Sequence, residues 1–118
     1  MFVLKGRSMD IKTIEKKLQK FSKAREWDKF HSPKNISMAM SVEVAELVEI
    51  FQWLSEDESR NLDSDQIRCV KEEVADISIY ILTMCMKLDI DLEEAVLSKI
   101  QLNEKKHPAF GNKKERAE

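Results

Sequence analysis

Residues 38–54 read MAMSVEVAELVEIFQWL, and this stretch decides the fold. Twelve of its 17 residues are apolar, and a helix that is apolar around most of its circumference must be buried on more than one side. A chain of 118 residues has little interior for that. We therefore predict a helix over about 37–55 that packs both within one copy of the chain and between copies. The chain is expected to form a homo-oligomer.

The rest of the composition agrees with a helical protein. The chain is 42% hydrophobic and 36% charged, and it holds only two glycines and two prolines. That is too few turn residues for a sandwich, a barrel or a doubly wound sheet, so the predicted fold class is all-α. The two glycines, Gly6 and Gly111, lie at the two ends of the chain. A glycine-rich phosphate loop is therefore excluded.

Four helices are expected, and together they predict a four-helix bundle. The first covers about 9–25, where apolar residues recur at three- and four-residue spacing. Pro33 should prevent helix in the polar stretch before the second. The third runs over about 64–88 with Ser64 as its N-cap. The fourth is capped by Asp91, with Glu94 placed for a capping box, and ends before Pro108. The second and third should form the oligomer core.

These helices make up one predicted domain, residues 9–110, between an N-terminal extension (1–8) and a charged tail (111–118). A net charge of −2 gives no basis for binding a nucleic-acid polymer. No apolar run reaches the 18 or so residues that a membrane span needs. Cys69 and Cys85 fall in apolar helical patterns and are expected to be free, buried thiols in a reducing compartment. A cytoplasmic protein is the resulting expectation.

Two acidic pairs lie on the central helices, Glu43 with Glu46 and Glu73 with Asp76. Their three-residue spacing is no evidence by itself, because chance predicts about four such pairs at this composition and the sequence has five. Their position on the helical wheel is more informative. At about 100° per residue, both pairs fall within apolar stripes, which are formed by Leu47, Ile50 and Leu54 on one helix and by Ile77, Tyr80 and Met84 on the other.

Four carboxylates on two facing apolar stripes need a compensating cation, because each buried charge costs several kcal/mol, of order 2–7 or more, when unpaired. Neither stripe contains a basic residue. Oxygen-only ligands favour Mg²⁺, with Mn²⁺ as a substitute, over zinc. A di-iron site would need Glu-x-x-His motifs on the helices that carry the acids. His31 follows no glutamate by three, and the one match, Glu104 to His107, lies at the end of the fourth predicted helix, away from both acidic pairs. A calcium loop of the EF-hand type is also missing. Such a magnesium site favours phosphoryl chemistry by direct attack of water.

These residues resemble the MazG-like superfamily of all-α nucleoside triphosphate pyrophosphohydrolases, and most closely its dCTP pyrophosphatase branch. The resemblance rests on E-x-x-E at 43–46, followed after 26 residues by E-x-x-D at 73–76. REWDKFHSPKN (25–35), EVAELVEIFQW (43–53), EEVADISIY (72–80) and LSK (97–99) extend it over about residues 10–110. It implies hydrolysis of a deoxynucleoside triphosphate, dCTP first among the dNTPs, to a monophosphate and pyrophosphate. It also implies a homodimer or a tetramer built as a dimer of dimers.

The resemblance also implies roles for individual residues. Glu43, Glu46, Glu73 and Asp76 match metal ligands and catalytic residues. The implied substrate contacts are Trp27 and Trp53 around the base, Tyr80 on the sugar, His31 in the entry loop, and Lys99 with Asn103 on the fourth helix. His107 departs from the aromatic residue expected before the proline, and the connection at 56–63 is short for this branch.

Two other functions stay open at this point. A helical interaction module would bind partner proteins through its methionine-rich helices, but it has no use for acids on apolar faces. A dUTPase-type enzyme of the same fold would differ in the choice of base, and the Trp27 and Trp53 pair favours cytosine or broader recognition. Glu49 and Glu72 are second choices for orienting the attacking water.

Overall fold

The computed structural model describes residues 8–109. Within them the elements are α1 (Ile11–Ala24), the 3₁₀ turn η1 (Asp28–Phe30), α2 (Pro33–Phe51), α3 (Glu56–Arg60), α4 (Ser64–Leu88) and α5 (Leu92–Lys106). These residues contain no strand, which confirms the all-α prediction. The predicted tail (111–118) and all but the last residue of the predicted extension (1–8) lie outside the described residues.

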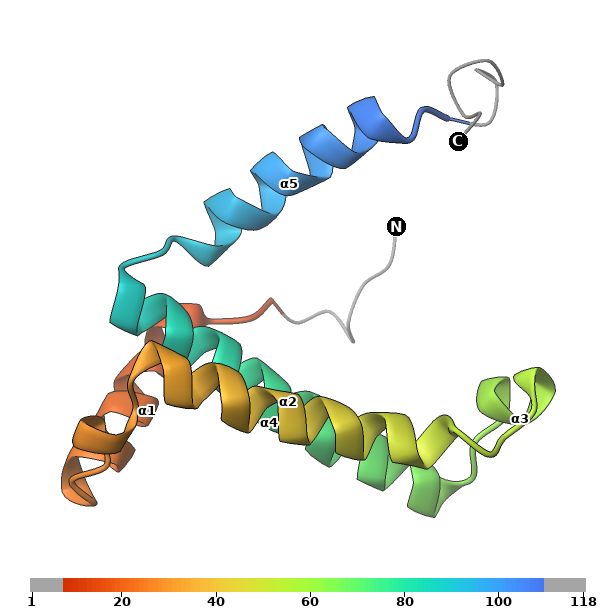
Figure 1. The fold of residues 1–118 in the computed structure, drawn as a ribbon, viewed down its shortest axis with the longest axis horizontal. Coiled ribbons are helices and arrows are strands. Elements are labelled where there is room, and N and C mark those ends of the chain that lie inside the picture. The colour runs from red at the N-terminus through yellow and green to blue at the C-terminus, as the bar shows by residue number, and fades with distance from the viewer. Residues whose placement is uncertain (1–7, 110–118) are drawn as a thin grey trace. The chain divides into compact units, whose positions relative to one another are not determined.

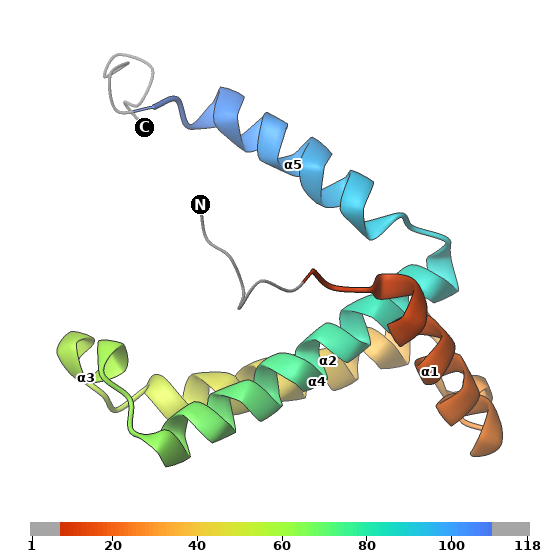
Figure 2. The ribbon, with the colours of Figure 1, turned by 180° about the vertical axis from the view of Figure 1, so that it is seen from behind.

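The chain divides into two units, one ending at Leu88 and the other beginning at Asp89. In the first unit, α2 and α4 lie side by side along most of their lengths (Figures 1 and 2). Helix α1 packs against α4. The buried side chains are few: Ile36 from α2, and Leu82, Thr83 and Cys85 from the last turns of α4. The second unit is the helix α5 and its flanking residues, so a bundle of four helices stays a prediction.

The second helix is displaced toward the N-terminus from its predicted range, because Pro33 begins the helix instead of preventing it. Pro33 occupies the first turn, where a missing N–H costs no hydrogen bond. Ser32 is the N-cap, and its Oγ accepts from the Asn35 N–H at 3.1 Å. The helix ends at Phe51 and not at Ser55, since a turn from Leu54 N–H to the Phe51 carbonyl follows.

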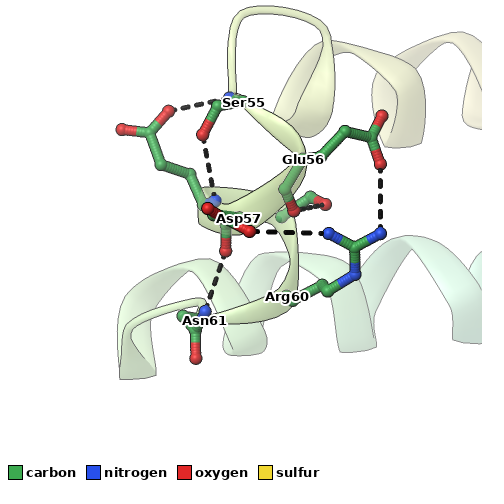
Figure 3. Close-up of polar contacts among 7 residues, drawn as sticks. Ser55, Glu56, Asp57, Arg60 and Asn61 are labelled. Carbon is green, nitrogen blue, oxygen red and sulfur yellow. Dashed lines mark hydrogen bonds and ion pairs between the residues drawn. The ribbon is translucent and has the colours of Figure 1, made fainter.

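A short helix, α3, occupies part of the acidic stretch 56–63, where the sequence predicts only a connection. Its start is a complete capping box: Ser55 Oγ accepts from the Glu58 N–H, and Glu58 accepts from the Ser55 N–H at 2.8 Å (Figure 3). Arg60 lies 3.6 Å from Glu56 and 3.7 Å from Asp57. These local contacts let five residues form a helix.

The caps of the later helices differ in detail from expectation. Asp63 and not Ser64 caps α4, because its Oδ1 accepts from the Gln66 N–H at 2.8 Å. Asp91 caps α5 as predicted, through the Glu94 N–H at 3.1 Å. The expected capping box is wrong, since the Glu94 side chain accepts from the Ser98 hydroxyl instead.

Both cysteines are free, as predicted. Cys85 is buried, whereas Cys69, on the first turns of α4, is only half-buried. Desolvation raises the pKa of the Cys85 thiol, and Glu15 adds to that rise. In the described residues, no helix is long and apolar enough to cross a membrane.

Large apolar side chains remain exposed on α2. Met38, Val42 and Val48 keep more than half of their surface accessible, as the predicted contact between copies requires. The homo-oligomer itself stays a prediction.

Candidate metal centre and adjoining pocket

Three of the four predicted acids come together between α2 and α4. Glu43, Glu73 and Asp76 each place one carboxylate oxygen within 4.8 Å of the others. All three side chains are half-buried. The two helices run side by side, so residues on facing stripes meet although they are far apart in the sequence. The geometry therefore agrees with the helical-wheel argument for these three residues.

Glu46 is the fourth predicted acid, and it lies at the edge of this group. Its side chain is exposed, and it is not among the mutually close oxygens. It is nevertheless near enough to raise the pKa of both Glu43 and Glu73 through hydrogen bonding and charge repulsion. Glu46 is therefore a neighbour of the cluster and not a member of its closest set.

Partial burial and neighbouring negative charges raise the pKa of two of the clustered acids, Glu43 and Glu73. Desolvation is the largest cause that raises the pKa of Glu43, to about 7, and repulsion from Glu46, Glu73 and Asp76 adds to it. The pKa of Glu73 is also raised, first by desolvation and then by Glu46. Without a cation, this site favours binding a proton at neutral pH.

The cluster suits a hard divalent cation. Glu73 Oε2 is buried and has no hydrogen-bond partner, which is costly unless a positive group neutralises it. Among residues 8–109, no lysine or arginine forms an ion pair with any of the three acids. The donor set is carboxylate oxygen only, which Mg²⁺ and Mn²⁺ prefer.

A pocket of about 480 Å³ adjoins the cluster, and Glu43 and Asp76 belong to its wall. This size lies within the range of small-molecule sites. The rest of its lining is mainly apolar and aromatic, and it comes from α1, the segment before α2, and the later turns of α4: Ile14, Lys17, Leu18, Phe21, Ser22, Trp27, His31, Ile79, Tyr80 and Thr83.

One wall of the pocket is a chain of ring contacts. The Phe21 and Trp27 centroids lie 5.4 Å apart, edge to face, and those of Trp27 and His31 lie 6.1 Å apart. Arg25 stacks 3.6 Å from the Phe21 centroid. His31 Nδ1 is buried without a hydrogen-bond partner. This wall offers ring faces and one unpaired ring nitrogen to a ligand.

The predicted substrate residues divide into two groups. Trp27, His31 and Tyr80 line the pocket beside the acids. Trp53 does not line the pocket; it lies two residues beyond the end of α2, and its side chain is 86% exposed. Lys99 and Asn103 are exposed residues of α5, which belongs to the other unit.

The second-choice acids lie outside the site. Glu49 is exposed on α2, and Glu72 lies 4.0 Å from Arg68. Neither residue lines the pocket.

Sequence reasoning missed that α1 forms one side of the pocket. The apolar stripe on α1 was visible as a pattern, and Lys17 interrupts it, lying between Ile14 and Leu18. A basic residue on an apolar stripe is the same kind of signal that marked the acids. Lys17 is the only lysine or arginine among the pocket-lining residues.

Comparisons with known proteins show which proteins this chain is similar to. The model of the MazG-like family matches residues 38–118. dCTP pyrophosphatase 1 of Homo sapiens is 35% identical over 91 residues, which cover 75% of this chain and 54% of that protein. The Mus musculus protein of the same name is 34% identical over 90 residues, covering 75% and 53%. The chain thus spans about half the length of these relatives.

A solved structure gives a longer match. The crystal structure of a pyrophosphatase from Archaeoglobus fulgidus has a TM-score of 0.80 and 40% sequence identity to this chain. The match covers 86% of this chain and 95% of the other.

Proposed function

The chain belongs to the MazG-like family, and from this premise we propose that it is a Mg²⁺-dependent nucleotide pyrophosphohydrolase. The proposed reaction converts a deoxynucleoside triphosphate, with dCTP as the first candidate, to a monophosphate and pyrophosphate. One observation carries the proposal: Glu43 and Asp76 belong both to a cluster of carboxylates and to the wall of an aromatic pocket. A metal-bound triphosphate and its base would thus occupy adjoining places.

The pocket wall suits a nucleoside. Trp27 and His31 present aromatic surface on which a base can stack. Tyr80 follows Asp76 by one helical turn and also lines the pocket. We assign Tyr80 to the sugar, where close packing would disfavour a 2′-hydroxyl.

In the proposed reaction Glu43, Glu73 and Asp76 would hold the metal, since their oxygens lie within 4.8 Å of one another. A bound Mg²⁺ would supply positive charge to the phosphates and lower the pKa of the attacking water. That water attacks the α-phosphorus, and the bond from this phosphorus to the α,β-bridging oxygen breaks, releasing pyrophosphate. We assign the proton of the water to Glu46, which adjoins the cluster but is exposed and outside its closest set.

From charge balance we propose more than one ion in the substrate complex. Four carboxylates and a triphosphate together carry roughly −8, of which one Mg²⁺ offsets only a quarter. Lys17 in the pocket wall adds one positive charge on the nucleotide side. We assign Lys99 and Asn103 of α5 to the departing pyrophosphate.

We also propose a homo-oligomer, either a dimer or a dimer of dimers. The exposed apolar residues of α2 and the 86% exposed Trp53 support it, because side chains of this size are seldom left in water in such number. In that assembly Trp53 would be covered by a second copy.

The test is to incubate the purified protein with each of the four dNTPs and with dUTP, with Mg²⁺ and then with EDTA, and to quantify the products. The expected result is monophosphate plus pyrophosphate, fastest from dCTP and lost in EDTA. Preference for dUTP would identify a dUTPase-type enzyme instead. Orthophosphate as the product would exclude cleavage between the α- and β-phosphates. Turnover of none of these nucleotides would favour a binding module and overturn the proposal.

A further inference from the structure

The segment between α1 and α2 carries two residues of the pocket wall, Trp27 and His31, and it contains little regular structure. Its only element is the single 3₁₀ turn η1. Glu26 precedes Trp27 with a φ of 54°, in the left-handed region that is unfavourable for a residue other than glycine. Its backbone hydrogen bonds join it only to neighbours in the sequence, as from the Trp27 N–H to the Ser22 carbonyl at 3.0 Å. Among the described residues, its attachment to α4 is therefore made by side chains.

Its two ends are held by neighbours in the sequence. At one end, Trp27 lies against Phe21 of α1. At the other, the Asn35 amide donates to the Phe30 carbonyl at 3.1 Å, and Ser32 caps α2. None of these contacts attaches the segment to α4, which supplies the opposite wall of the pocket.

Among the hydrogen bonds and ion pairs of residues 8–109, one ion pair joins this segment to α4. Lys87 belongs to the last turn of α4, and its Nζ lies 3.5 Å from Oδ1 of Asp28. Asp28 is the residue that follows Trp27 in the sequence. All other ion pairs among residues 8–109 join residues three or four positions apart on one helix. The Lys87 side chain is 29% exposed, well below the 63–66% of the arginines in those other pairs, whereas its partner Asp28 is 62% exposed. Solvent therefore screens this pair at Asp28 and less at Lys87, so its contribution should lie in the upper part of the range for surface pairs.

We propose that Asp28 and Lys87 are a positioning pair that holds the Trp27–His31 wall against α4 and so keeps the pocket closed around its ligand. Neither residue lines the pocket, and neither adjoins the carboxylate cluster. The pair should consequently affect the affinity for the nucleotide and the accessibility of Trp27, and leave the chemical step unchanged. The effect on affinity rests on the proposed function, whereas the effect on Trp27 does not.

The experiment uses two readouts. The first is acrylamide quenching of Trp27 in a Trp53→Phe background, where Trp27 is the only remaining tryptophan. The second is the separate measurement of KM and kcat for dCTP in the presence of Trp53. The variants are Asp28→Asn, Lys87→Met and the charge swap Asp28→Lys with Lys87→Asp. Asp65→Asn is the matched control, because Asp65 lies 3.6 Å from Arg68 in an exposed pair within α4.

Each single variant should increase quenching and raise KM by about two- to fivefold, the range expected for one such ion pair, with kcat changed by less than about twofold. The swap should restore both values, and Asp65→Asn should change neither. Near 1 M salt, where screening is about 3 Å, the wild type should approach the single variants in quenching. Equal quenching in Asp28→Asn and Asp65→Asn, or a swap that restores nothing, would overturn the proposal. If the protein hydrolyses no nucleotide, the quenching experiment alone still tests whether Asp28 and Lys87 hold the Trp27–His31 wall in place.

Discussion

Glu43 of α2 and Asp76 of α4 bring carboxylate oxygens within 4.8 Å of each other and both line the same pocket. These two residues belong both to the carboxylate cluster and to the lining of the pocket. A change at either position should thus affect both the proposed metal and the proposed nucleotide.

The first prediction concerns the acids themselves. Asp76→Asn and Glu46→Gln should each lower kcat by at least about 100-fold, the loss typical when one group that stabilises or activates the reacting atoms is removed. Circular dichroism should show unchanged helix content. Glu49→Gln, on the exposed side of α2, is the control and should keep full activity. Unfolding of both variants would mean that the acids are structural.

The second prediction concerns pH. The pKa of Glu43 is raised from 4.5 to about 7, so the folded state binds a proton that the unfolded state releases. The stabilisation from this proton is fully present below pH 4.5 and is lost as the pH rises through about 7. The metal-free protein should therefore show a higher Tm near pH 5.5 than near pH 8 in scanning calorimetry.

Glu43→Gln tests the origin of that pH dependence, because it removes the titrating group and keeps the shape of the side chain. Its Tm should vary less with pH and should exceed the wild-type value near pH 8. Addition of Mg²⁺ should raise the Tm of the wild type most at alkaline pH, where proton competition is weakest. An identical pH profile in the two proteins would contradict the assignment.

The third prediction concerns the sugar. Tyr80 lines the pocket one turn after Asp76, and shortening it should make room for a 2′-hydroxyl. Tyr80→Ala should increase the kcat/KM for CTP relative to dCTP by about tenfold, the effect of losing one modest steric contact. Tyr80→Phe keeps the ring and should retain the wild-type ratio. An unchanged ratio in Tyr80→Ala would place the sugar elsewhere.

The fourth prediction concerns assembly. Val42 and Val48 are 57% and 53% exposed on α2, so a charge at either position should disrupt a contact between copies. Light scattering after size exclusion should give a multimeric mass for the wild type at micromolar concentration and a smaller one for Val48→Glu. Lys16→Glu makes the charge more negative on the exposed side of α1 and is the control, so it should not change the mass. A monomeric wild type would contradict the proposed oligomer.

The acid cluster could be predicted from the sequence because its residues lie on two long helices, where side-chain direction repeats with a known period. Long helices fix the direction of each side chain, so the helical period alone places Glu43, Glu46, Glu73 and Asp76 on apolar stripes. The packing of α2 on α4 then decides that three of them come together and that Glu46 stays exposed at the edge. Helix ends were less predictable. Pro33 begins α2 because the first turn of a helix does not use the N–H that proline lacks. Asp63 caps α4 through one hydrogen bond, and a choice between neighbouring cap residues changes the free energy of unfolding by only about 1 kcal/mol.

The pocket could be predicted only in part because it depends on tertiary packing. The stripe on α1 was recognisable, but nothing in its period shows that it faces α4 beside Asp76 and makes Lys17 a wall residue. The family resemblance assigned Trp53 to the base. Its side chain is exposed in a single chain, so Trp53 could contact a base only in the proposed oligomer.

Ile36 is the only large side chain among residues 8–109 that retains less than 2% of its exposure. A core this small cannot offset the conformational entropy of about 100 ordered residues. In the proposed oligomer, folding and association should therefore be one thermodynamic event, so the midpoint of thermal unfolding should depend on protein concentration and dilution should itself promote unfolding.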